Sequence, residues 1–329
     1  AGIASSALLQ SFAVAQSRRV ENVGLQLYTL RKELADDFDG TLARVAELGY
    51  KEMEFAGYFG RSAAQIKSAL DANGLVSPAA HIQWAAVRDN LQSEIERAVE
   101  VGVGTIVMDS MHEIERVAAA ATKFGKVQRV YLRLTPGIQA HTHESISTAH
   151  EDVKFGFSIA SGAAWAAVEA VATHPELELL GVHCHIGSQI FGSEAHEIAT
   201  DRLIGFMAKY RDVYGKELPE LDLGGGFGIA YIDGDVTVEP SDVLPQIHAA
   251  VKKACAQHNL AIPLVSLEPG RNIVGPTMFT LYEVGTVKDV VVDGGKIRKY
   301  VSVDGGMSDN ARTALYDAQY TAVIAQRNS

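Results

Sequence analysis

Leu221-Asp222-Leu223-Gly224-Gly225-Gly226-Phe227-Gly228 joins a short apolar segment directly to a run of three glycines. The apolar segment predicts a buried strand, and glycines after a strand let backbone N–H groups approach a phosphate closely. Tight turns without any ligand also use glycine in this way. The stretch therefore predicts a strand end that can hold an anion, and its meaning depends on the neighbouring strand ends.

Two further predicted strand ends carry compatible groups. His183-Cys184-His185-Ile186-Gly187-Ser188 offers a hydroxyl, and Glu268-Pro269-Gly270-Arg271 offers a cation and another glycine. The carboxyl ends of barrel strands meet on one face, where barrel active sites form. Three phosphate-compatible elements on adjacent strands predict one shared site more strongly than any one of them does.

The chain around these motifs alternates between strand and helix patterns. Eight such units in about 255 residues are typical of a (β/α)8 TIM barrel. An open, doubly wound sheet is the alternative, and the position of the three motifs at carboxyl strand ends favours the barrel. The predicted strands cover residues 23–28, 52–55, 76–82, 105–109, 130–134, 179–183, 221–223 and 264–267.

The helix ends are marked by capping residues and glycines. Asp39 and Ser62 are expected to cap two helices at their N-termini, and Gly74 is expected to end the second. Two further helices are expected over residues 195–214 and 242–258.

After Gly275-Pro276 the pattern changes to alternating strands, with Asp293-Gly294-Gly295 as a hairpin turn. We therefore expect three segments: a leader or signal-peptide remnant over 1–18, the barrel over 19–277 and an incomplete β domain over 278–329.

The composition narrows the class of protein. The net charge is −11 and lysines and arginines form no cluster, which argues against nucleic acid as a partner. The two cysteines form no metal-binding or disulfide pattern. Residues 1–16 are small and apolar but too short to span a membrane. They are equally consistent with a clipped export signal and with a disordered or helical leader. The sequence therefore allows either a cytoplasmic or an exported location.

Several side chains at the three strand ends suit an aromatic cofactor. Glu268 beside a pyridine nitrogen would keep that nitrogen protonated, although an ion pair with a neighbouring arginine is the structural alternative. His185 can stack on a ring. His183 and His185 face the same side of a strand and can bind a metal in principle, but no third ligand with suitable spacing is visible. We therefore predict no metal.

From about residue 94 to residue 329 the chain resembles the diaminopimelate decarboxylase family. The resemblance rests on the runs GVHCHIGSQIF, ELDLGGGFGIAY, LEPGRNIVGP and YVSVDGGMSDNARTALYDA. It implies an alanine-racemase-like barrel that binds pyridoxal 5'-phosphate, decarboxylates meso-diaminopimelate to L-lysine in lysine biosynthesis, and forms a homodimer.

The resemblance also implies roles for particular residues. His185 would stack on the cofactor ring and Glu268 would pair with its nitrogen. Arg312 and Tyr316 would bind a substrate carboxylate, which the planar fork of an arginine suits. Arg271 would reach both phosphate and substrate. The residues expected around the cofactor phosphate are Ser188, Gly225, Gly226, Gly270 and Arg271.

The chain departs from that family near its N-terminus. The lysine expected to form a Schiff base on the first barrel strand is missing, since Gly24-Leu25-Gln26-Leu27-Tyr28 stands there, and Lys32 is the nearest candidate. Residues from about 20 to 90 instead resemble sugar-phosphate isomerase/epimerase proteins of the xylose-isomerase-like barrel family. This implies a chimera, with barrel units one to three of one origin and units four to eight of the other.

Three hypotheses follow. The chain is a pyridoxal-phosphate decarboxylase, a non-catalytic barrel that binds pyridoxal phosphate or another phosphate, or a sugar-phosphate isomerase. The missing lysine counts against turnover, and the metal ligands that the third hypothesis needs are absent from the sequence.

Overall fold

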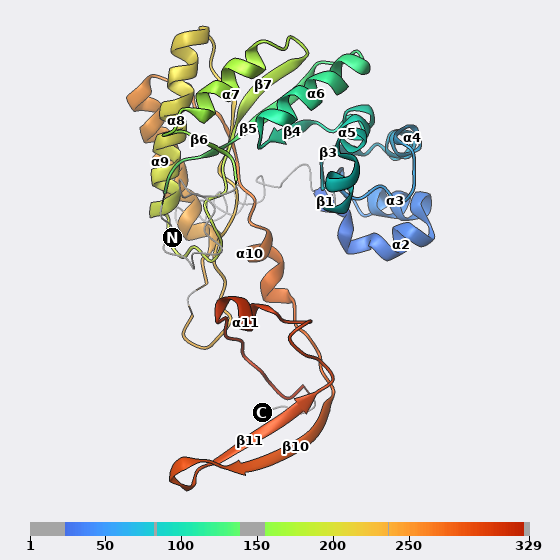
Figure 1. Ribbon diagram of the computed structural model, residues 1–329, viewed down its shortest axis with the longest axis vertical. Helices are drawn as coiled ribbons and strands as arrows, with labels where there is room; N and C mark the ends of the chain where they lie inside the picture. The colour runs from blue at the N-terminus through green and yellow to red at the C-terminus, as the bar shows by residue number, and fades with distance from the viewer. Residues whose placement is uncertain (1–23, 82–83, 139–154, 236, 326–329) are drawn as a thin grey trace, which may run out of the picture. The chain divides into compact units, whose positions relative to one another are not determined.

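The computed structural model describes residues 24–81, 84–138, 155–235 and 237–325 (Figure 1). The chain divides into two compact units, which we describe separately. The first comprises Ala1–Tyr131 and Val168–Leu179, and the second comprises Leu132–Ala167 and Leu180–Ser329. This division differs from the limits expected from sequence, 19–277 and 278–329, which stay predictions.

The first unit begins with three parallel strands in the order β1-β2-β3. Their bounds are β1 Gly24–Gln26, β2 Glu52–Ala56 and β3 Val76–His81. The helices between and after them are α2 Arg31–Asp36, α3 Phe38–Glu47, α4 Ala63–Asn73 and α5 Trp84–Val101.

The first strand is shorter than expected. The chain leaves β1 at Gln26 and turns into a 3-10 helix, η1, over Leu27–Leu30. The Gln26 side chain accepts a hydrogen bond from the Tyr28 amide at 3.1 Å, which stabilises this early turn. A side-chain bond to the backbone competes with the strand ladder here, so the prediction of a strand as far as Tyr28 was wrong.

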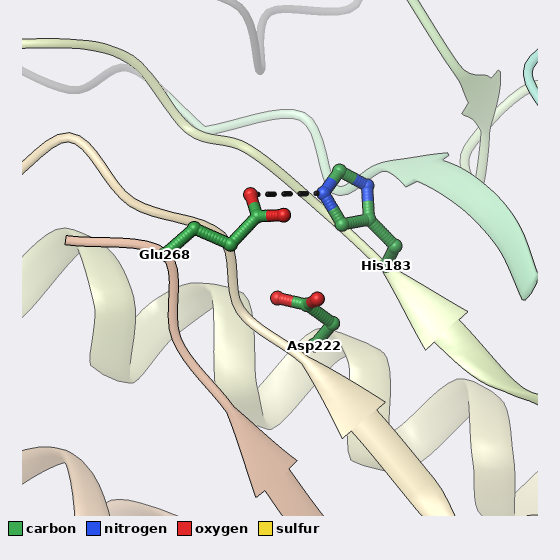
Figure 2. Close-up of side chains that lie close together, drawn as sticks. All are labelled: His183, Asp222 and Glu268. Carbon is green, nitrogen blue, oxygen red and sulfur yellow. Dashed lines mark ion pairs between the residues drawn. The ribbon is translucent and has the colours of Figure 1, made fainter. Parts of the chain in front are cut away.

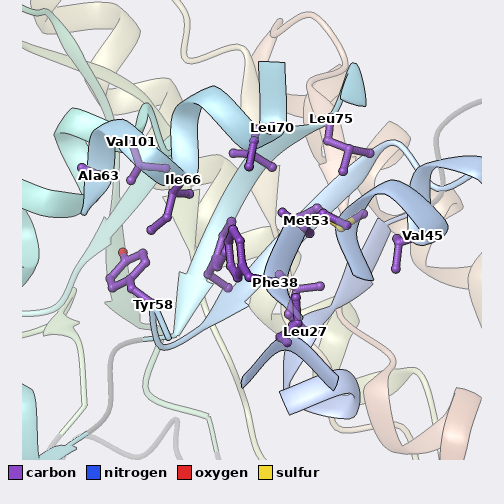
Figure 3. Packing of buried hydrophobic residues seen from close by; sticks show 14 residues of the cluster. Leu27, Phe38, Val45, Met53, Tyr58, Ala63, Ile66, Leu70, Leu75 and Val101 are labelled. Carbon is purple, nitrogen blue, oxygen red and sulfur yellow. The ribbon is translucent and has the colours of Figure 1, made fainter. Parts of the chain in front are cut away.

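Apolar side chains of these strands and helices form the core of the first unit (Figure 3). Phe38 on α3 stacks on Phe55 of β2 with ring centroids 6.4 Å apart. Successive residues of a strand face opposite sides, and Met53 and Phe55, two apart, are both fully buried. The helices contribute apolar side chains to this core, Leu34 from α2 and Phe38 and Leu42, one turn apart, from α3.

Local capping sets the helix ends. Ser62 and Gln65 form a reciprocal capping box at the start of α4, and Gly74 ends it with a φ of 62°. The cap at Ser62 and the end at Gly74 were expected. The cap of α3, however, is Asp37, whose carboxylate accepts from the Gly40 amide at 3.1 Å. The expected cap, Asp39, lies inside the first turn, where a carboxylate is still favourable to the helix dipole.

The remaining parallel strands form a second sheet in the order β4-β5-β7-β8-β9, with β6 beside β5. Strands β5 and β7 pass from the first unit into the second. The bounds are β4 Thr105–Met108, β5 Gln128–Thr135, β6 Phe157–Ser158, β7 Leu177–His183, β8 Glu220–Asp222 and β9 Leu264–Ser266. The helices are α6 Met111–Lys123, α7 Ala163–Ala172, α8 Glu194–Tyr214 and α9 Pro240–His258.

All eight expected strands are present as β1 to β5 and β7 to β9. Strand β7 is buried at nearly every position, which is typical of a parallel strand covered on both faces. In the described residues, β3 and β4 belong to separate hydrogen-bonded sheets. The alternation of strands and helices along the chain is the one expected of the α/β barrel class.

The C-terminal part is a two-stranded antiparallel hairpin. Strands β10 (Val284–Val291) and β11 (Ile297–Val303) pair with Val291 opposite Ile297. The expected turn over Asp293–Gly295 forms as the 3-10 helix η4. Short elements flank the hairpin, α10 Gly270–Val274, η3 Gly275–Thr277 and α11 Arg312–Tyr316. Among the described residues, no helix is long and apolar enough to cross a membrane.

Candidate functional site

The segments that follow β7, β8 and β9 lie side by side in the second unit. The Cys184 amide donates to the Asp222 carbonyl at 2.9 Å, and the Glu268 amide donates to the Gly224 carbonyl at 2.9 Å. The sheet ladder thus continues past the strand ends. The three motifs singled out in the sequence are brought together by this continuation.

His183, Asp222 and Glu268 converge at the start of these segments (Figure 2). The His183 Nε2 atom lies 3.5 Å from Glu268 Oε2. One ligand-type atom from each of the three residues lies within 4.8 Å of the other two. His183 and Asp222 are buried, whereas the Glu268 side chain is 56% exposed. Glu268 therefore pairs with a histidine and not with the neighbouring arginine weighed from the sequence.

The two carboxylates of this cluster have opposite pKa shifts. The hydrogen bond from His183 lowers the pKa of Glu268. Burial, and then the nearby charge of Glu268, raise the pKa of Asp222. Like charges in close proximity disfavour full ionisation of both groups. The outer carboxylate therefore keeps its charge, and the buried one holds a proton more readily.

The glycine turn is fixed by side chains on both sides. The Gly224 amide donates to Asp222 Oδ1 at 2.8 Å, and the Gly225 amide donates to His185 Nδ1 at 3.4 Å. Gly226 has a φ of +99°, and a Cβ atom there would collide with the Gly187 carbonyl. The Gly225 amide, expected at a phosphate, is thus directed to His185.

His196 on α8 holds the same turn from the other side, a role that sequence reasoning missed. Its Nε2 donates to the Gly225 carbonyl at 3.4 Å, and its ring stacks on Phe227 at a centroid distance of 4.9 Å with an interplanar angle of 2°. The side chain is fully buried, and burial lowers its pKa. A histidine on the buried face of an amphipathic helix was the only signal in the sequence.

Groups suited to an anion follow His185 and Glu268 closely in the chain. Ser188 is half-buried after Gly187. A Cβ at Gly270 would meet no atom within 4 Å, so open space adjoins its backbone. The Nη1 atom of Arg271 is buried without a hydrogen-bond partner. A buried guanidinium N–H without a partner is costly, and an anion would satisfy it.

Arg133 is a second residue that the sequence reasoning did not single out. It lies on β5, its guanidinium stands over the Phe155 ring at 4.6 Å, and its charge lowers the pKa values of His185 and Glu268. For His185 the largest cause is burial. A charged residue in the otherwise apolar stretch Val130–Leu134 was the available signal.

The other expected site residues lie elsewhere. Lys32 is exposed on α2 of the first unit. Arg312 and Tyr316 lie on α11, with the guanidinium 5.3 Å from the tyrosine ring centre. The structure thus brings His185, the glycine turn and Glu268 into contact, and Ser188 and Arg271 each follow three residues after His185 and Glu268 in the chain. Arg312 lies over the ring of Tyr316, and their expected binding of a substrate carboxylate stays a prediction.

Most of the chain matches one known protein family. The family described as pyridoxal-dependent decarboxylase, pyridoxal binding domain, matches residues 54–275. This chain belongs to that family. The match covers the glycine turn and the Glu268 motif. It also begins inside the segment 20–90 that resembles an isomerase/epimerase, so residues 54–90 fall within the decarboxylase match.

Individual members of the decarboxylase family are similar over part of their length. A diaminopimelate decarboxylase from Mycobacterium tuberculosis is 52% identical over 244 residues, which are 72% of this chain and 54% of that protein. One from Corynebacterium efficiens is 47% identical over 235 residues, 71% of this chain and 51% of that protein. The chain spans about half the length of the curated relatives it matches.

Solved structures of the family share the fold. A diaminopimelate decarboxylase from M. jannaschii, in complex with L-lysine, aligns with a TM-score of 0.66 at 23% identity. The alignment covers 95% of this chain and 67% of that one. At this identity the likeness concerns the fold, and the expected α/β barrel class is confirmed.

Proposed function

We propose that this chain binds pyridoxal 5'-phosphate at the ends of β7, β8 and β9 and serves the family reaction, decarboxylation of meso-diaminopimelate to L-lysine. The observation that carries the proposal is the meeting of Glu268, His185 and the glycine turn at one set of strand ends. Relatives at 47% and 52% identity named diaminopimelate decarboxylase support the choice of reaction.

The residues present fit the phosphate of this cofactor. The unpartnered Nη1 of Arg271 supplies a charged donor, and the half-buried hydroxyl of Ser188 supplies a neutral one. Open space beside Gly270 leaves room for phosphate oxygens next to the backbone. Charge-assisted hydrogen bonds to phosphate are about twice as strong as neutral ones, so Arg271 would contribute most.

The residues also fit the ring. Burial lowers the pKa of His185, which keeps its imidazole neutral and suited to stacking. The hydrogen bond from His183 lowers the pKa of Glu268, which keeps that carboxylate ionised beside the place where a ring nitrogen would carry a proton. Asp222, behind Glu268, holds the turn through the Gly224 amide.

When bound, the cofactor supplies an electron sink for the charge left on the α-carbon as carbon dioxide departs. The chain supplies binding and orientation. Glu268 would hold the proton at the ring nitrogen, and Arg271 would hold phosphate and reach a substrate carboxylate. Arg312 and Tyr316 would bind the second carboxylate of the substrate.

The lysine that anchors the cofactor is the open element of the proposal. Lys32 is the candidate of this chain, and it is exposed on α2. The alternative, a barrel that binds the cofactor without turnover, rests on the same phosphate and ring contacts and needs no lysine. The two proposals therefore differ in the covalent attachment of the cofactor.

A titration with pyridoxal 5'-phosphate followed by borohydride reduction tests both. We expect saturable binding that weakens by at least about tenfold, or ~1.4 kcal/mol, in Arg271→Ala and hardly changes in Arg298→Ala, an exposed arginine of β11. Mass spectrometry then locates any reduced adduct. An adduct at Lys32 with release of carbon dioxide from diaminopimelate supports decarboxylation.

Binding without an adduct supports the non-catalytic alternative, and no binding at all contradicts both. The isomerase/epimerase reading, and with it the chimera of segments 20–90 and 94–329, is favoured by no observation on the described residues and stays a prediction from sequence.

We also propose the substrate class and partners from the resemblance. A small amino acid is the proposed substrate class, with neither nucleic acid nor membrane as partner. The homodimer and a cytoplasmic location are proposed from the resemblance alone. The leader of residues 1–16 lies outside the described residues.

A further inference from the structure

The cluster of His183, Asp222 and Glu268 has the composition of a metal site. One imidazole and two carboxylates come from three neighbouring strand ends, and His183 is only 7% exposed. Its Nε2 points toward Glu268, whereas its Nδ1 is buried without a hydrogen-bond partner (Figure 2). The ring thus sits in the core with its Nε2 atom directed at the Glu268 carboxylate.

The charge of the surroundings favours a cation. Asp222 and Glu268 place two carboxylate oxygens within 4.8 Å of each other and of a ring nitrogen of His183. A bound cation would offset the repulsion between these two carboxylates.

We propose that His183, Asp222 and Glu268 together bind one Zn²⁺ ion. This departs from our expectation from sequence that the chain has no metal site. The sequence showed His183 and His185 as a candidate pair and no third ligand. The structure instead combines His183 with carboxylates from the two adjacent strand ends, which local spacing does not reveal.

The geometry suits zinc with small adjustments. Zinc lies about 2.0–2.2 Å from histidine nitrogen and carboxylate oxygen, so tetrahedral ligands stand about 3.3–3.5 Å apart. The 3.5 Å between His183 and Glu268 matches this spacing. All three ligand atoms lie within 4.8 Å of one another, so side-chain rotations must bring the more distant atoms closer for zinc to bind. Three protein ligands and a solvent-facing side leave a fourth position for water.

Zinc binding itself does not depend on the proposed function. The effect of zinc on cofactor binding, however, rests on that function. Glu268 is also the residue proposed to hold the ring nitrogen of pyridoxal phosphate. One carboxylate cannot serve both groups at once, so zinc and the cofactor would exclude each other. Zinc would then act as an inhibitor of cofactor loading.

Titration of the metal-free protein with Co²⁺, a spectroscopic substitute for Zn²⁺, tests the site. We expect one Co²⁺ per chain with visible absorption bands of a four- or five-coordinate ion, displaced by Zn²⁺. His183→Gln and Asp222→Asn should each weaken binding by at least about tenfold. Asp222→Asn retains an oxygen acceptor for the Gly224 amide, so the turn is preserved. His112→Gln, an exposed residue of α6, is the matched control.

Two results would overturn the proposal: no stoichiometric Co²⁺ spectrum, or a spectrum that neither His183→Gln nor Asp222→Asn alters. Urea unfolding of each variant shows whether a loss of binding reflects a loss of fold. In a second arm, pyridoxal 5'-phosphate is added to the Zn²⁺-loaded protein. Release of zinc supports the shared use of Glu268, whereas zinc retained in the presence of bound cofactor leaves the metal site standing and contradicts the proposed position of the ring.

Discussion

At the scale of single residues, the glycine turn is built from backbone contacts that leave no room for a side chain. Gly226 has a left-handed φ of +99°, and a Cβ there would collide with the Gly187 carbonyl. Gly234 has nearly the same φ, +97°, but a Cβ there would meet nothing within 4 Å. A side chain at either position would have to adopt the unfavourable left-handed conformation. Only at Gly226 would its Cβ atom also collide with neighbouring backbone.

Gly226→Ala is therefore expected to disturb the turn and Gly234→Ala to leave it intact. Both changes cost about 1–2 kcal/mol for the left-handed conformation, and Gly226→Ala adds the displacement of backbone. Urea unfolding and the Kd for pyridoxal 5'-phosphate measure the two effects. Equal loss of stability and equal affinity in both variants would contradict the role given to the turn.

His196 makes the stability of the second unit depend on pH. Burial lowers its pKa, whereas an unfolded histidine titrates near about 6.5. Its contribution is thus fully present above about pH 6.5 and is lost as pH falls through the lower folded pKa. His196→Phe keeps a ring against Phe227 and cannot titrate.

We expect the parent to lose free energy of unfolding relative to His196→Phe between about pH 7.5 and about pH 5. The contribution of His185, which shifts in the same direction, is common to both proteins and cancels. Urea titrations at several pH values provide the measurement. Parallel curves would show that His196 is not held neutral in the fold.

At the scale of elements, local sequence determined where many helices begin and end. The α4 helix is the clearest case, because Ser62 accepts from the Gln65 amide at 3.2 Å and its own amide donates to the Gln65 side chain at 2.9 Å. Ser62 and Gln65 are three residues apart in the chain, which is the spacing of a capping box, so the sequence alone predicts this cap. The start of α3 at Asp37 shows the limit, since Asp37 and Asp39 are both plausible caps by local chemistry.

Ser62→Ala is expected to lower the free energy of unfolding by about 1 kcal/mol, because the Gln65 amide loses its acceptor. Ser68→Ala, at an exposed position within the same helix, should change it by no more than a few tenths of a kcal/mol, toward higher stability. Thermal or urea unfolding followed by circular dichroism compares the pair. A larger loss in Ser68→Ala would be inconsistent with the cap.

At the scale of the whole molecule, the hairpin β10–β11 presents apolar side chains to solvent. Val291 and Ile297 stand opposite each other and are 72% and 67% exposed. Exposed apolar surface on a strand pair favours association. We therefore expect the hairpin to promote self-association.

The double variant Val291→Lys with Ile297→Lys is expected to reduce concentration-dependent association, measured by sedimentation velocity, and to leave the Kd for pyridoxal 5'-phosphate unchanged. The double variant Asp201→Asn with Asp233→Asn alters the net charge by the same +2 at exposed sites away from the hairpin. If both variants associate less, net charge and not the apolar surface is responsible.

The sequence by itself determined the strand order, the helix spacing and the three motifs at the carboxyl ends of β7, β8 and β9. These features depend on residues close together in the chain, such as the apolar stretch before Gly224. Only the tertiary structure decided the pairing of His183 with Glu268, the hold of His196 on Gly225 and the presence of Arg133 nearby. Each joins residues 29 or more positions apart, and their meeting depends on the register of neighbouring strands and on which face of a helix is buried. Those are properties of the packed chain, because no local pattern specifies a partner that another strand supplies.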